Sequence, residues 1–121
     1  MIFLRIGVSY VLLAVALGAL GTHAFAAELK LYDTQTIFQT ARDYLAYHGL
    51  ALVAAGFADS RVKDLKIERA LMLLAIGAAF FSGALFIFAL SNWKLITHLA
   101  PLGGGMMIVG WLMMLFRVWR R

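Results

Sequence analysis

The sequence predicts an all-α integral membrane protein, a four-helix bundle with both termini cytoplasmic. Hydrophobic residues make up 64% of its 121 residues, and the mean hydropathy is +0.89. Charged residues make up 14%, whereas ordinary soluble domains carry about 25%. A soluble domain of this size has too little interior to bury so much apolar surface. Lipid must therefore cover the remainder, and four apolar runs separated by short charged loops provide the spans.

One membrane domain accounts for the whole chain, residues 1–121. A membrane-spanning helix needs about 20 mostly apolar residues. Charge-free runs of about that length occupy 6–27, 70–93 and 95–116, and a shorter one occupies 44–58. The expected spans lie at about 6–27, 41–58, 69–91 and 99–117.

The first span contains no charged residue, and a single central Arg or Asp would oppose insertion by about 2.5–3.5 kcal/mol. Its end, Ala24-Phe25-Ala26, imitates the small-x-small cleavage site of a secretory signal. The apolar run is longer than the usual signal core of about 7–15 residues. We therefore expect a retained span, with cleavage as the alternative that N-terminal sequencing would decide.

The second span is the short one. The run 44–58 gives about 22 Å of helix, less than a hydrocarbon core about 30 Å thick. We expect the helix to extend outward, with Arg42 reaching the headgroups and Tyr44 and Tyr47 near the interface. Asp33 or Thr34 would cap this helix. A half-span or re-entrant segment is the alternative.

The third and fourth spans are joined by an outer turn that begins near Ser91, with Trp93 at interface depth. Pro101 fits the first turn of the fourth span, where its missing N–H costs nothing. The glycines that follow, 103–105, are not a phosphate loop, because no Lys-Ser/Thr follows them and they lie at membrane depth.

Basic residues indicate the orientation of the chain. With four spans, one side holds Arg5, Arg61, Lys63, Lys66, Arg69, Arg117, Arg120 and Arg121, and the other holds Lys30, Arg42 and Lys94. Positively charged loops stay cytoplasmic, which places both termini inside a plasma (bacterial inner) membrane. Topology and anionic lipid explain the net charge of +5. A nucleic-acid partner is not expected, since no basic stripe is interleaved with stacking aromatic residues.

Small residues are expected to pack the helices. Apolar side chains gain nothing by leaving lipid for one another, so helices in a membrane associate where small residues let their backbones approach. The expected packing positions are Gly18, Gly21, Gly83, Gly103 and Gly104. A self-association surface is the alternative use of such positions.

Polar residues on the outer side are the sharper candidates for function. They form a candidate intramembrane cluster of His23, Tyr44, His48, Ser82 and His98. An ionisable residue inside a membrane is a functional hypothesis by default, and histidines could bind a proton, zinc or haem iron. No spacing matches a metal motif, and the chain has no cysteine. We therefore expect structural hydrogen bonds, with no cofactor, no metal and no catalytic residue.

Four short elements, taken in order, resemble a known family. They are Gly-Ala-Leu-Gly-Thr-His at 18–23, Tyr-x-x-x-His at 44–48, Phe-Ser-Gly-Ala-Leu at 81–85, and Pro-Leu-Gly-Gly at 101–104 followed by Trp111. Together they resemble the domain-of-unknown-function 423 family of transmembrane protein 256-like small membrane proteins. The resemblance spans nearly the whole chain. It implies a small multi-span membrane protein of unestablished activity, and it supplies no catalytic residue.

The sequence favours an interaction or accessory protein over an enzyme. The expected partners are the lipid bilayer and either further copies of the chain, as a homo-oligomer, or a larger membrane complex. Glycine-rich faces and the lack of a catalytic constellation support this interpretation. A transport or small-ligand- or proton-binding module that uses the outer polar cluster is the first alternative. A redox or metal-binding subunit is the second.

Overall fold

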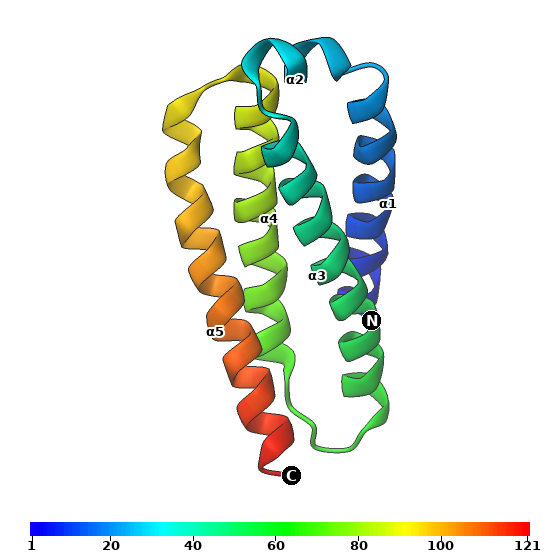
Figure 1. Cartoon of the computed structure of the whole chain (residues 1–121). Coiled ribbons are helices and arrows are strands. Elements are labelled where there is room, and N and C mark those ends of the chain that lie inside the picture. The colour runs from blue at the N-terminus through cyan, green and yellow to red at the C-terminus, as the bar shows by residue number, and fades with distance from the viewer.

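The computed structural model describes all residues, 1–121, and confirms an all-α protein (Figure 1). It contains helices and no strands. The elements in order are α1 (Ile2–Thr22), α2 (Ala26–Tyr32), α3 (Gln35–Arg61), α4 (Glu68–Ser91), the 3₁₀ helix η1 (Lys94–His98) and α5 (Leu99–Trp119).

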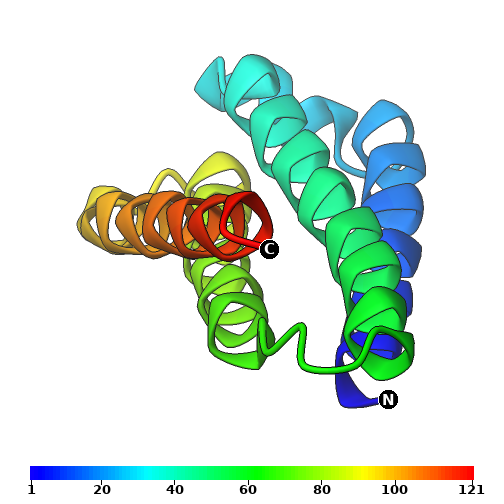
Figure 2. The ribbon, with the colours of Figure 1, turned by 90° about the horizontal axis from the view of Figure 1, so that it is seen from below.

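The four long helices alternate in direction (Figure 1). Helices α2 and η1 lie at one end, and both termini and the α3–α4 loop lie toward the other. Backbone contacts join α1 to α3, α3 to α4 and α4 to α5, whereas α1 and α5 do not meet (Figure 2). A closed bundle would also pair these two outer helices, so the predicted four-helix bundle is not confirmed.

Three helices are long and apolar enough to cross a membrane: Ile2–Thr22, Glu68–Ser91 and the continuous stretch Lys94–Trp119. Helix α3 has the length, at 27 residues. Its first part carries several polar residues, including Arg42 and Asp43, which lower its hydropathy. The span expected at 41–58 therefore stays a prediction.

The start of α3 differs from the capping that we expected. Asp33 adopts a left-handed conformation (φ 53°) and ends the short helix α2, which the sequence analysis did not identify. Thr34 stands at the N-cap of α3 without a side-chain capping bond. Its buried hydroxyl instead donates to the carbonyl oxygen of Ala89, at 2.6 Å, and ties the start of α3 to the end of α4.

Glycines set the two closest helix crossings. A Cβ atom on Gly7 of α1 would lie 2.6 Å from the carbonyl oxygen of Gly49 on α3. A Cβ atom on Gly103 of α5 would lie 2.5 Å from the carbonyl oxygen of Gly77 on α4. Neither crossing has room for a side chain, as expected where helices in lipid pack backbone to backbone.

Two of the expected packing glycines do not hold this chain together. Gly83 has open space where its side chain would be, and Gly104 meets only the ring of Phe81, at an ordinary 3.8 Å. The sequence motif was misleading because α4 faces α5 with Gly77. A small residue at helical spacing does not reveal which side of its helix is covered.

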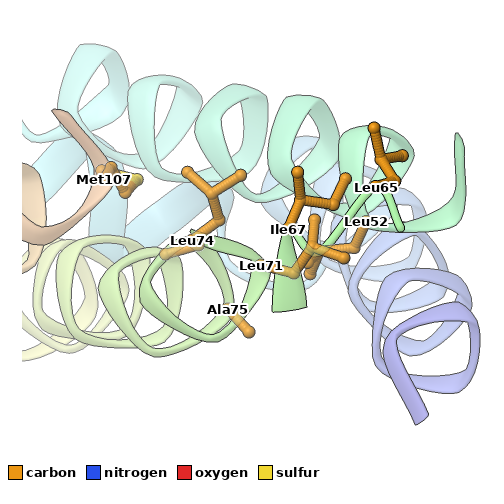
Figure 3. Packing of buried hydrophobic residues seen from close by; sticks show 8 residues of the cluster. Leu52, Leu65, Ile67, Leu71, Leu74, Ala75 and Met107 are labelled. Atoms are coloured by element: carbon orange, nitrogen blue, oxygen red, sulfur yellow. The ribbon is translucent and has the colours of Figure 1, made fainter. Parts of the chain in front are cut away.

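Apolar side chains fill the space between the crossings in two clusters. One, shown in Figure 3, combines Leu52 of α3 with Leu71 and Leu74 of α4 and Met107 of α5. The other surrounds Phe38, whose ring meets that of Phe86 edge-on with centroids 5.1 Å apart. Each cluster takes side chains from helices distant in sequence, which fixes the order of the helices.

The C-terminus holds the α3–α4 loop. Arg117 donates to the carbonyl oxygens of Leu65 (2.8 Å) and Asp64 (2.9 Å), and Arg121 donates to that of Lys63 (3.0 Å). Three consecutive loop carbonyls therefore accept hydrogen bonds from α5 and its C-terminal end.

Replacing Gly103 with Ala should destabilise the protein, because the added methyl would overlap the backbone of α4. Overpacking typically costs about 1–3 kcal/mol. Gly105→Ala is the matched control on the same helix, since open space surrounds that position. Thermal unfolding in detergent should show a lower midpoint for Gly103→Ala alone. Equal midpoints for the two variants would contradict the Gly77–Gly103 crossing.

Candidate functional site

A histidine–tryptophan pair joins two helices whose backbones do not touch. His48 lies on the buried side of α3, with 6% of its surface exposed. The indole N–H of Trp111, on α5, donates to Nε2 of His48 at 3.0 Å. Both helices pack on α4 and have no backbone contact with each other. This hydrogen bond therefore links α3 to α5, two helices that otherwise meet only through α4.

The partners of His48 define its protonation. An indole nitrogen can only donate a hydrogen bond, so Nε2 of His48 must accept and carries no proton. Nδ1 lies 2.8 Å from the carbonyl oxygen of Tyr44, one turn earlier on α3. A carbonyl can only accept, so Nδ1 holds the proton. His48 is thus a neutral imidazole with both nitrogens engaged, which leaves no free nitrogen for a metal ion.

Aromatic rings extend this pair toward the protein surface. The ring of Tyr44 stacks near that of His48, with centroids 6.1 Å apart, and meets Phe81 of α4 at 4.8 Å. Tyr47 lies 6.2 Å from Tyr44. Tyr44, Tyr47 and Trp111 are all at least 40% exposed. The site therefore has a buried imidazole at its base and polar aromatic edges outside.

Ser82, another residue of the predicted cluster, is buried without a hydrogen-bond partner. It is 1% exposed, and its hydroxyl oxygen has no hydrogen-bond partner. It lies next to Phe81 in α4, but no hydrogen bond joins it to His48 or Tyr44.

The other two histidines lie apart from this pair. His23 is the C-cap of α1 and His98 ends η1. Both are exposed, and neither side chain forms a hydrogen bond. No group of three His, Asp or Glu side chains is arranged to hold a metal ion. Of the five predicted residues, the structure brings Tyr44 and His48 together, beside Phe81, the neighbour of Ser82.

Trp111 is the residue that reasoning from the cluster missed. In the sequence it stands out only within the family resemblance, as the residue downstream of the Pro-Leu-Gly-Gly element. Its distance of 63 positions from His48 carries no local signal. Only the packing of α3 and α5 on the same face of α4 brings the donor to the acceptor.

A second feature lies at the end of α1 next to α2. A recess of about 240 Å³ is lined by Gly18, Gly21, Thr22, Ala26, Leu29, Gln35, Phe38, Gln39 and Arg42. A Cβ atom on Gly18 would lie 2.9 Å from Cδ of Arg42, and one on Gly21 would lie 2.5 Å from the ring of Phe38. These glycines therefore let α3 side chains lie across α1. Arg42 also pairs with Asp43 at 2.8 Å.

Comparisons with known proteins place this geometry in context. Residues 17–104 match the family described as "Protein of unknown function (DUF423)". The UPF0382 membrane protein of Staphylococcus saprophyticus is 35% identical over 113 residues, which cover 93% of this chain and 92% of the relative. UPF0382 inner membrane protein YgdD of Escherichia coli K12 is 35% identical over 101 residues, or 84% and 76% of the two chains. No solved structure matches.

Replacing Trp111 with Phe should remove the only donor to Nε2 of His48. Hydrogen bonds between membrane helices contribute about 0.6 kcal/mol on average and up to about 1.7, so a modest loss of stability is expected. Nitrogen-15 NMR should find His48 protonated on Nδ1 in the parent protein, with the Nε2 signal shifted in the variant. Trp119→Phe, at the exposed end of α5, serves as the control. A proton on Nε2 in the parent protein would refute the assignment.

Proposed function

Because this chain belongs to the DUF423 family, whose relatives are named UPF0382 membrane proteins, we propose that it is a four-span interaction or accessory protein of the plasma membrane. It acts by lateral association with copies of itself or with a larger membrane complex, and not as an enzyme. The observation that carries this proposal is the polar character of the exposed face of α3, in the half of the helix next to α2.

The exposed face of α3 changes character along its length. Near the α3–α4 loop it presents Leu50, Ala54 and Phe57, which suit lipid. Toward α2, the same face presents Thr36, Gln39, Thr40, Asp43 and Tyr47, each at least partly exposed. Residues three and four apart share a helix face, so these polar groups form one stripe that points away from α4.

The inner part of this polar stripe, Asp43 and Tyr47, lies within the expected span 41–58. Asp43 precedes Asp59 by about 24 Å of helix, so with Asp59 at the inner boundary Asp43 lies near the outer edge of a hydrocarbon layer about 30 Å thick. Polar and ionisable groups within a span almost always face protein or a water-filled cavity. The partial exposure of Asp43, 42% for its side chain, therefore supports a protein neighbour on this side of α3.

The topology in this proposal follows from charge. The N-terminus, the α3–α4 loop and the C-terminus lie toward the same end of the molecule (Figure 1), and most basic residues belong to these segments. Cytoplasmic segments carry the excess of Lys and Arg. Four spans with both termini inside satisfy this rule, with α3 as the second span and α2 and η1 outside.

A second candidate function is binding of a small ligand at the outer end. The recess beside Gly18 supports it, because its walls combine Gln35, Gln39 and Arg42 with Phe38. Transport would need a continuous polar path across the membrane, and four helices are too few to surround such a path. This alternative therefore also favours an oligomer.

The double variant Gln39→Leu/Tyr47→Leu should weaken lateral association by at least about tenfold, because it replaces polar contacts on the α3 stripe with apolar groups. Native mass spectrometry after gentle detergent extraction would measure the oligomer or co-purifying partner. Leu12→Ala/Val15→Ala alters exposed residues of α1 instead and should leave the complex intact. A parent protein that is found only as a monomer without a partner would contradict the proposal. An equal loss of the complex in the two double variants would also contradict it.

Reporter fusions should place the two ends of α5 on different sides. An alkaline phosphatase domain fused after Asn92 should be active outside, whereas the same domain fused after Arg121 should be inactive and remain in the cytoplasm. The physical reason is retention of the basic C-terminal end inside. Activity of the Arg121 fusion alone would indicate the reverse topology. Activity of both fusions would mean that α5 does not cross the membrane and would rule out four spans.

A further inference from the structure

The end of the molecule that carries the termini holds the whole net charge. Its basic residues are Arg5, Arg61, Lys63, Lys66, Arg69, Arg117, Arg120 and Arg121, against Asp59, Asp64 and Glu68. At the opposite end Lys30, Arg42 and Lys94 balance Glu28, Asp33 and Asp43. The net charge of +5 is therefore concentrated at one membrane surface.

Not all of these cations are available to a partner. Arg117 and Arg121 donate to the α3–α4 loop, and Lys66 lies 3.8 Å from Asp64. Arg61 and Arg120, at the ends of α3 and α5, form no side-chain hydrogen bond and no ion pair with the protein.

Arg5 and Arg69 also lack such partners, but Arg61 and Arg120 alone lie over an aromatic ring, and both are held in the same way. The guanidinium of Arg61 lies 5.2 Å from the ring centroid of Phe57, and that of Arg120 lies 5.0 Å from that of Phe116. Each Phe precedes its Arg by four residues and so lies one turn deeper along its helix. Phe57 and Phe116 are 50% and 62% exposed. Each pair therefore presents a ring toward the hydrocarbon and a guanidinium toward the headgroups.

We infer that these two pairs bind the headgroups of anionic phospholipids. A guanidinium seated on an aromatic ring keeps its planar N–H groups free for a phosphate, which it recognises with two hydrogen bonds. The neighbouring ring contacts the acyl chains of the same lipid. A soluble phosphate would satisfy only the guanidinium, so the exposed rings favour a lipid. This inference needs membrane insertion alone and does not depend on lateral association.

Competition between two lipids tests the inference. The purified full-length protein is titrated with a mixture of phosphatidylglycerol and phosphatidylcholine, and bound lipid is counted by native mass spectrometry. Each basic residue near a membrane surface contributes about 1 kcal/mol with anionic lipid. Arg61→Gln/Arg120→Gln should therefore reduce the preference for phosphatidylglycerol by about 20-fold or more.

Lys30→Gln/Lys94→Gln is the matched control, because it removes the same charge from the opposite end. This variant should keep the parent protein's preference for phosphatidylglycerol over phosphatidylcholine. Glycerol phosphate, added in excess, should displace little lipid if the rings contribute as inferred. An equal affinity of the parent protein for both lipids would overturn the inference, and that measurement needs no variant to fold. Equal losses in the two double variants, or full displacement by glycerol phosphate, would also overturn it.

Discussion

Helices α4 and α5 meet where Gly77 faces Gly103, and α1 and α3 meet where Gly7 faces Gly49. In lipid, apolar side chains gain little by exchanging hydrocarbon for one another, so close backbone contact must supply the attraction. These two crossings organise the molecule as two pairs of helices, which α3 and α4 then join. The order of the helices, the clusters of buried side chains and the bridge between α3 and α5 all depend on them.

Between these crossings, single polar contacts fix the alignment of the helices. The hydroxyl of Tyr10 on α1 donates to the carbonyl of Ala75 on α4 at 2.6 Å, and that of Thr34 donates to Ala89 at the other end of α4. Trp111 reaches His48 across α4. Each donor would be costly to leave unpaired in hydrocarbon, so the packing of each helix pair has one favoured register.

The surface of this scaffold is differentiated along the membrane normal. Helices α1, α4 and α5 present apolar faces suited to lipid, and α3 adds the polar stripe on which the proposed lateral association rests. The basic end presents arginines supported by phenylalanine rings. The proposed recognition by lateral contact and by headgroup charge is compatible with relatives that are named as membrane proteins.

The sequence by itself determined the all-α class, three of the four expected spans as helices long and apolar enough to cross a membrane, the one-sided charge and family membership. These properties depend on composition, run length and order, which are local. It also placed Tyr44 and His48 on one helix face, because a spacing of four suffices for that. Only the tertiary structure decided that Gly77 and not Gly83 faces α5, that Thr34 binds α4 instead of capping α3, and that Trp111 is the partner of His48. Those outcomes depend on how the helices rotate and cross. A helix that is apolar all round has no polar side in its sequence to show which face is buried.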